Sequence, residues 1–263
     1  MATVIHPTAI VPPAASIGDG CEIGPYCVIG EHVSLGPGCV LHSHVILDGH
    51  TQIGGQTEIF PCACLGKKTQ DLKYKGGTPK VRIGSRCSIR EYVTVHAATA
   101  DGDTTVVGDG CLIQAYCHVA HDCVLGNGVI MSSGAMMAGH VKVGDNAVVS
   151  GMAGIVQFAR IGTMAFIGGF SKVTHDALPY CITDGIPAAS VAVNKVGMER
   201  HGKGPDAIRA VGEALKLIMF GTRTVEQVLP DLDRDFAAFP EVQEMVRFVR
   251  TCERGLARPK NVH

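Results

Sequence analysis

The sequence predicts a parallel β-helix over residues 1–187 and a small helical domain at the end of the chain. The main observation is an aliphatic residue at every sixth position from Ile5 to Val173, with the rhythm broken only at positions 71, 77 and 101. A second observation is that the following position is often Gly, while the fifth position is small or β-branched. A period of six matches neither a helix nor a simple alternating strand, and a short fixed period is typical of a solenoid.

Each six-residue unit is expected to form a short strand followed by a tight corner. The residues at positions one and five point inward, and stacked coils lie about 4.8 Å apart, as neighbouring strands do. Gly, Asn and Asp near the corners accept unusual backbone angles at little cost. The pattern resembles the hexapeptide-repeat proteins, whose solenoids are left-handed and place three units, or about 18 residues, in each coil.

The rhythm divides the chain into three predicted regions. Residues 1–187 form the β-helix, with loops at 66–80 and 99–105, where the sequence is polar and rich in Gly. Interruptions of a repeat usually become loops on one face, which is often the binding face. Residues 188–204 are expected to be a connector, and residues 205–263 a helical domain. In that domain, Thr224 and Gln227 have the spacing of a capping box.

Composition excludes several classes of protein. The 263 residues carry a formal net charge of −1, which indicates no attraction to nucleic acid. We expect no membrane span, no signal peptide and a cytoplasmic protein. Of the eleven cysteines, seven occupy position five of a unit, where a thiol packs as a small apolar group. We therefore predict neither disulfides nor a bound metal, and no cofactor.

The strongest candidate for chemistry is His121, followed directly by Asp122. A carboxylate that holds an imidazole orients it, which suits a general base. With three units per coil, Gly139 stacks on His121 and His140 stands beside it, so that a bare glycine N–H could face an oxyanion. One corner histidine alone is more often a solvated polar residue. Three histidines, including His118, aligned within about two coils beside an acid favour a function.

Several stretches resemble the bacterial UDP-N-acetylglucosamine acyltransferases, the family that catalyses the first step of lipid A synthesis. They are the opening IHPTAIV, QDLKY at Gln70–Tyr74, HVAHDCVLGN at His118–Asn127, AGHV at Ala138–Val141, and the helical end of the chain from Lys203. HxAHD together with QDLKY is specific, whereas the six-residue units alone are not. The resemblance implies a homotrimer, with sites between subunits, that moves a (R)-3-hydroxyacyl chain from acyl carrier protein to the glucosamine 3-hydroxyl of UDP-N-acetylglucosamine.

The resemblance also implies roles for individual residues. His121 is the general base, Asp122 orients it, and the N–H of Gly139 binds the oxyanion. Gly169 matches the position that measures the acyl chain, and a glycine there predicts a chain longer than ten carbons. Contacts to the sugar nucleotide or the acyl donor are implied for Gln70, Asp71, Lys73, His118, His140, Gln157, Asn194 and Arg200.

Two positions depart from the family pattern, and other functions stay open. Val156 stands where the family commonly has His, and His201 where it often has a second Arg. One alternative is a zinc enzyme like the γ-type carbonic anhydrases, with metal held between subunits by His118, His121 and His140. That hypothesis leaves the His121–Asp122 pair and QDLKY unexplained. Another is a related hexapeptide-repeat acyltransferase that uses a coenzyme A donor or an amine acceptor. A solenoid with only a structural role would leave the histidines without purpose.

Overall fold

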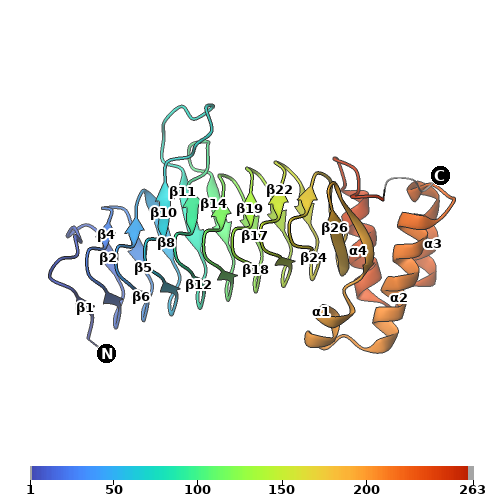
Figure 1. Ribbon diagram of the computed structural model, residues 1–263, viewed down its shortest axis with the longest axis horizontal. Helices are drawn as coiled ribbons and strands as arrows, with labels where there is room; N and C mark the ends of the chain where they lie inside the picture. Colours follow the sequence, from blue (N-terminus) through green and yellow to red (C-terminus); the bar gives the residue numbers. More distant parts are fainter. Residues whose placement is uncertain (1, 260–263) are drawn as a thin grey trace.

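The computed structural model describes residues 2–259 and shows one long three-sided prism with helices at its C-terminal end (Figure 1). The prism has three parallel sheets, named A, B and C here, which the chain visits in turn. Sheet A contains β1 (Val4–Ile5), β3 (Glu22–Ile23), β6 (Val40–Leu41), β9 (Glu58–Ile59), β12 (Ser88–Ile89), β15 (Leu112–Ile113), β18 (Ile130–Met131), β21 (Val148–Val149), β24 (Phe166–Ile167), β26 (Cys181–Gly185) and β27 (Ala188–Val193).

The other two sheets have eight strands each. Sheet B contains β4 (Val28–Ile29), β7 (Ile46–Leu47), β10 (Cys64–Lys67), β13 (Thr94–His96), β16 (His118–Val119), β19 (Met136–Met137), β22 (Gly154–Ile155) and β25 (Lys172–Val173). Sheet C contains β2 (Ser16–Ile17), β5 (Ser34–Leu35), β8 (His50–Ile53), β11 (Lys80–Ile83), β14 (Thr104–Val107), β17 (Val124–Leu125), β20 (Lys142–Val143) and β23 (Arg160–Ile161). The predicted β-helix is therefore confirmed.

The register reveals where the repeat is interrupted. Val40 pairs with Glu22 on one side and Glu58 on the other, three units away in each direction. In sheet B the steps are longer, because Cys64 pairs with Thr94 and Thr94 with His118. The extra residues leave the prism between sheets B and C in two consecutive coils, as residues 68–79 and 97–103. Figure 1 shows both excursions rising together from one edge, which we call the B–C corner.

The core consists of the aliphatic and small inward positions that the sequence predicted. Ile23 and Cys21, at positions one and five of a unit, are 2% and 0% exposed. The thiols also form hydrogen bonds: Cys111 Sγ donates to Gly126 O at 3.2 Å, and Thr57 Oγ1 makes the same kind of contact with Gly84 O at 2.9 Å. Cys and Thr are interchangeable at this position because both are small and both satisfy a corner carbonyl. Burial raises the pKa of the Cys117 thiol to about 11, which fits a packing role.

The C-terminal part begins with a hairpin rather than a bare connector. Residues 188–204, where the sequence suggested only a connector, contain β27, which pairs antiparallel with β26, and helix α1 (Lys195–Arg200). A strand outside the repeat and a helix of six residues leave too little periodicity to recognise. The remaining helices are α2 (Pro205–Leu215), the π-helical turn η1 (Lys216–Phe220), α3 (Val225–Asp235) and α4 (Pro240–Arg250).

The helices pack around their own apolar core and are tied to the prism through the side chain of Arg160 in β23. Val211, Val228 and Val242 lie at the centre of this second core. The predicted capping box is confirmed, since the Thr224 N–H donates to Gln227 Oε1 at 3.1 Å. Arg160 is paired with the buried Asp176, and its guanidinium donates to Phe248 O and to Thr251 Oγ1, both at 2.9 Å. Among the residues that the structure describes, no helix has the length and apolar character needed to cross a membrane.

Candidate active site

The two excursions and the coil that follows them form one hydrogen-bonded unit at the B–C corner. Thr78 rests on the second excursion, with its N–H and its hydroxyl 2.7 Å and 3.0 Å from Asp101 Oδ1. Thr69 Oγ1 lies 3.4 Å from Thr99 Oγ1, and the Thr99 N–H contacts Asp122 in the next coil. The first loop thus lies on the second, and the second lies on the coil that carries His121. The excursions are placed to cover the corner where the sequence predicted chemistry.

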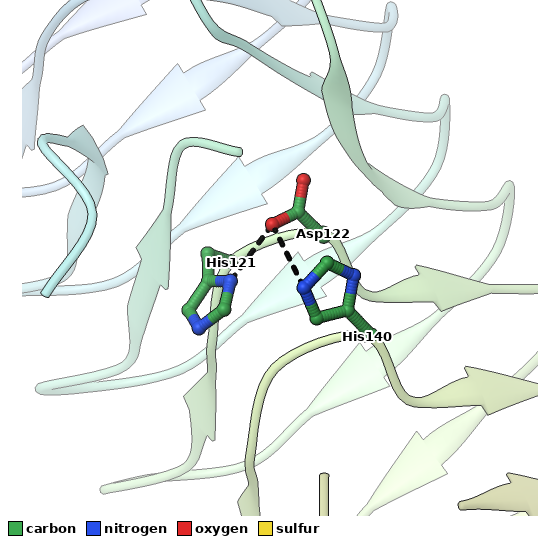
Figure 2. A group of neighbouring side chains, drawn as sticks. All are labelled: His121, Asp122 and His140. Atoms are coloured by element: carbon green, nitrogen blue, oxygen red, sulfur yellow. Dashed lines mark hydrogen bonds and ion pairs between the residues drawn. The ribbon is translucent and has the colours of Figure 1, made fainter. Parts of the chain in front are cut away.

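His121 and Asp122 form the predicted pair. His121 Nδ1 lies 2.7 Å from Asp122 Oδ2, and a dashed line marks this interaction in Figure 2. Thr99 Oγ1 lies 3.0 Å from the same ring nitrogen, and the Thr99 N–H donates to both carboxylate oxygens at 3.3 Å and 3.2 Å. The Asp122 N–H donates to Thr105 Oγ1 at 2.8 Å. An ionised carboxylate only accepts hydrogen bonds, so Nδ1 carries the proton and Nε2 keeps its lone pair.

Gly139 lets the His121 ring lie directly against the next coil. A Cβ on Gly139 would stand 2.2 Å from His121 Cε1, so any larger residue would displace the ring. The Gly139 N–H has no hydrogen-bond acceptor within the described part of the chain. Its position in the six-residue unit is the one that Pro25 and Pro61 fill at the corner between sheets A and B, where no N–H is needed. An unused donor beside a bare nitrogen lone pair is an arrangement for stabilising a developing oxyanion.

A cleft of about 570 Å³ opens in front of His121 Nε2. It brings together most of the predicted contact residues, and Asp71 Oδ2 lies 3.8 Å from Nε2. The residues that line it are Gln70, Asp71, Leu72, Lys73, His96, His118, Ala120, His121, Ala138, Gly139 and Gln157. The two charged residues of the first loop, Asp71 and Lys73, therefore line the same cleft as the candidate base His121.

His118 is held as a neutral imidazole at the back of the cleft. Its Nδ1 lies 2.7 Å from Thr94 Oγ1, and the ring of His96 meets it edge-on with centroids 5.0 Å apart. Burial, with smaller contributions from His96 and His121, lowers the pKa of His118 to about 4. Burial also lowers the pKa of His96. His96 and Thr99 were not among the residues predicted from the sequence. His96 could have been noticed because it occupies position two of its unit, where Gly is common, but nothing in the sequence singled out Thr99.

Other predicted residues lie outside this cleft. His140 lies beside both members of the pair: its Nε2 is 3.5 Å from Asp122 Oδ2 (Figure 2). Its ring meets that of His121 edge-on, with centroids 5.2 Å apart, and stacks on Phe158. Asn194 caps α1: its Oδ1 accepts from Gly197 N–H at 3.0 Å and its Nδ2 donates to Met164 O at 2.8 Å. Arg200 ends α1, and Gly169 is exposed at a corner between sheets A and B. The binding roles of Asn194, Arg200 and Gly169 stay predictions.

The geometry also bears on the zinc hypothesis. His121, Asp122 and His140 have ligand atoms within 4.8 Å of one another. The predicted zinc trio needs His118 instead of Asp122, and His118 is turned to Thr94. In the group that the structure does bring together, His121 Nδ1 already forms a short hydrogen bond with Asp122 Oδ2. The arrangement therefore fits a base held by an acid better than three imidazoles around a metal.

Similarity to known proteins decides between the remaining hypotheses. A relative from Myxococcus xanthus named acyl-[acyl-carrier-protein]–UDP-N-acetylglucosamine O-acyltransferase is 46% identical over 97% of this chain and 99% of its own. One from Anaeromyxobacter with the same name is 41% identical over 97% and 99%. The chain belongs to the UDP-N-acetylglucosamine O-acyltransferase family. It is an O-acyltransferase, and its coil is the left-handed β-helix that the resemblance implied.

Family profiles and solved structures extend the match to both parts of the molecule. The profile described as UDP N-acetylglucosamine O-acyltransferase, domain 2, matches residues 176–257, and that of the bacterial transferase hexapeptide matches residues 104–139. The acyltransferase of Francisella novicida superposes with a TM-score of 0.95 at 32% identity, covering 98% of this chain and 95% of that one. The Acinetobacter baumannii enzyme gives 0.94 at 38% identity, over 97% and 100%.

Proposed function

We propose that this protein transfers a (R)-3-hydroxyacyl chain from acyl carrier protein to the 3-hydroxyl of UDP-N-acetylglucosamine, with His121 as the general base. The names of its relatives supply the two substrates. The observation that carries the mechanism is the His121 ring itself. Asp122 and Thr99 contact its Nδ1 and so fix the orientation of the ring. Its Nε2 faces a cleft that is also lined by the Asp71 carboxylate and by Gly139, whose N–H is unused.

The reaction follows from this geometry. His121 Nε2 accepts the proton of the sugar 3-hydroxyl as that oxygen attacks the thioester carbonyl carbon. The tetrahedral intermediate places its oxyanion at the Gly139 N–H, and Asp122 stabilises the imidazolium. Collapse of the intermediate breaks the carbon–sulfur bond, and the leaving thiolate takes the proton back from Nε2. Atoms and charge balance, with the ester and the free carrier thiol as products.

The loop residues provide the contacts to the sugar. The Asp71 carboxylate can accept hydrogen bonds from sugar hydroxyls, and Gln70, Lys73 and Gln157 offer polar groups around the same space. His118 presents a neutral imidazole to the cleft. His140 contacts both Asp122 and the ring of His121, which suits a residue at the edge of the substrate site.

A homotrimer with sites between subunits accounts for the predicted residues that lie elsewhere. Asn194, Arg200 and Gly169 do not line the cleft of their own chain, so a neighbouring subunit is the natural source of such contacts. Asn194 is 7% exposed, and both its amide oxygen and its amide nitrogen already form hydrogen bonds within the chain. Only the second N–H of its amide is left to donate a hydrogen bond to a substrate. A cytoplasmic location is supported by the eleven cysteines, all free thiols in the structure.

The purified protein tests this proposal directly. Given UDP-N-acetylglucosamine and 3-hydroxyacyl carrier protein, it should form a 3-O-acyl product that mass spectrometry detects. It should use the coenzyme A thioester of the same acid poorly, and an acceptor with a 3-amine separates ester from amide formation. Efficient transfer from coenzyme A, or zinc bound in stoichiometric amount with carbonic anhydrase activity, would replace this function with one of the alternatives.

A further inference from the structure

Sheet B has a gap in its outer face beside the active site. The outward residues of consecutive strands are His118, Met136, Gly154 and Lys172. Met136 is 48% exposed, whereas Gly154 offers no side chain, and a Cβ built on it has nothing within 4 Å. The backbone of Gly154 does not require a glycine, because its φ lies outside the left-handed region. A glycine inside a strand costs stability and often marks the close approach of a ligand or another backbone.

This gap belongs to an apolar trough that is continuous with the His121 cleft. The trough has a volume of about 540 Å³, and it shares His118, Ala138 and Gln157 with the cleft. Its other lining residues are Met136, Met137, Gly154, Ile155, Val156 and Lys172. Val156, which stands where the family commonly has His, thus extends an apolar wall. A chain attached to a carbonyl carbon at His121 meets this wall next.

Two more glycines continue the path beyond the trough. Gly151 lies at the corner between sheets A and B in the same coil as Gly154, and Gly169 lies at that corner in the next coil. A Cβ on Gly151 would come no closer than 3.2 Å to Ser133 O, and one on Gly169 no closer than 3.4 Å to Gly151 O. A Cβ would therefore make an ordinary contact at Gly169 and a tight contact with a backbone carbonyl at Gly151, and neither position carries a side chain. Gly154, Gly151 and Gly169, none of which has a side chain, thus mark a path from the cleft across sheet B to the corner between sheets A and B.

We propose that Gly154 is a specificity-determining residue for the acyl group: its missing side chain lets a long 3-hydroxyacyl chain cross sheet B between Met136 and Lys172. This inference rests on the proposed acyl transfer. An alkyl chain is driven into such a trough by the burial of apolar surface, and every methylene beyond the gap adds to its binding. A side chain at position 154 fills the crossing point, so that only chains ending before it bind well.

The test is the chain-length profile of Gly154→Leu and of the milder Gly154→Ala. Carrier-protein donors of ten, twelve, fourteen and sixteen carbons are compared by kcat/KM. Gly154→Leu should lower kcat/KM for the longest accepted donor relative to the shortest by about tenfold or more, the usual discrimination of an apolar pocket. Gly154→Ala should shift the profile in the same direction by less. The KM for UDP-N-acetylglucosamine should stay unchanged, because the loop residues Gln70, Asp71 and Lys73 do not line the trough that contains Gly154.

The controls separate this inference from other outcomes. Ser34→Leu places the same side chain at an outward position of sheet C and should leave the profile unchanged. If Gly154→Leu keeps the wild-type preference, Gly154 does not determine specificity. If both Gly154 variants lose all donors equally and light scattering shows a changed oligomer, the gap accommodates a neighbouring backbone and the inference is wrong. If the wild-type protein itself transfers no acyl chain from any donor, the proposed function has failed first.

Discussion

Two corners of the same prism share one backbone conformation and differ in what they can do. At the A–B corner, Tyr92 and Tyr116 take left-handed φ values of 59° and 61° and stack in the open, 50% and 60% exposed. At the B–C corner, Asp122 and His140 have φ values of 60° and 61°. The repeat thus offers the same position at both corners.

What distinguishes the B–C corner is its cover. Both excursions leave the prism there, and Thr99 and Asp71 reduce the exposure of His121 to 9%. Excluding water strengthens the hydrogen bonds and charges inside the site. The comparison teaches that the regular repeat supplies a stiff frame, while the chemistry depends on the two places where the repeat is broken. Substitutions can test whether the corners differ in this way.

Replacement of the base should have the largest effect. His121→Ala removes the proton acceptor, and we expect turnover to fall by about 10²–10⁴-fold, the usual contribution of general-base catalysis. The matched control is His44→Ala, which removes an exposed histidine of the A–B corner and should leave turnover near wild type. Circular dichroism checks that both variants keep the β-helix. Equal turnover of His121→Ala and His44→Ala would contradict the claim that only the B–C corner carries a catalytic histidine.

Crowding the ring should have the next largest effect. The added methyl group of Gly139→Ala meets His121 Cε1 at 2.2 Å and must displace the imidazole, so we expect kcat to drop by about tenfold to a hundredfold. Gly204→Ala is the control, since a Cβ there meets nothing within 4 Å. A steady-state assay compares them. A kcat of Gly139→Ala equal to that of the wild type would show that catalysis does not require the His121 ring to pack against position 139.

Loss of the loop contact should cost less. Thr99→Val keeps the backbone N–H to Asp122 but removes the hydroxyl beside His121 Nδ1, and one such hydrogen bond contributes about 0.5–1.5 kcal/mol. We expect kcat to fall by up to about tenfold, with KM nearly unchanged, and Thr99→Ser to restore it. A defect in Thr99→Ser as large as in Thr99→Val would show that packing, and not the hydroxyl, matters.

Stability against pH provides a separate test that does not depend on turnover. Burial lowers the pKa of His118 from 6.5 to about 4, so between these values the unfolded chain binds a proton that the folded chain does not. The free energy of unfolding should therefore decrease as pH falls from about 6.5 towards 4. His118→Gln should flatten this decrease, with a part retained because the pKa of His96 is lowered as well. Thermal unfolding at several pH values measures it, and an identical slope in both proteins would contradict the burial argument.

The sequence predicts local features well and remote contacts poorly. The inward rows, such as Ile23 and Cys21, follow from the six-residue period because each unit forms its own strand and corner. The His121–Asp122 pair was visible because its members are adjacent. Thr99 lies 22 residues before His121 and meets it only through the way the excursion folds back, which no periodicity encodes. Asn194 was assigned to substrate by resemblance alone, and its role as the cap of α1 needed the fold.

The pH dependence of kcat/KM in wild type and His121→Ala tests the central claim most directly, namely that His121 removes the sugar proton. In the wild type, kcat/KM should fall tenfold per pH unit on the acid side, because protonation of one group abolishes the base. Protonation of His118 would produce such a fall only near its own pKa of about 4. The residual rate of His121→Ala should lose the acid limb. An unchanged acid limb in His121→Ala would show that another group takes the proton.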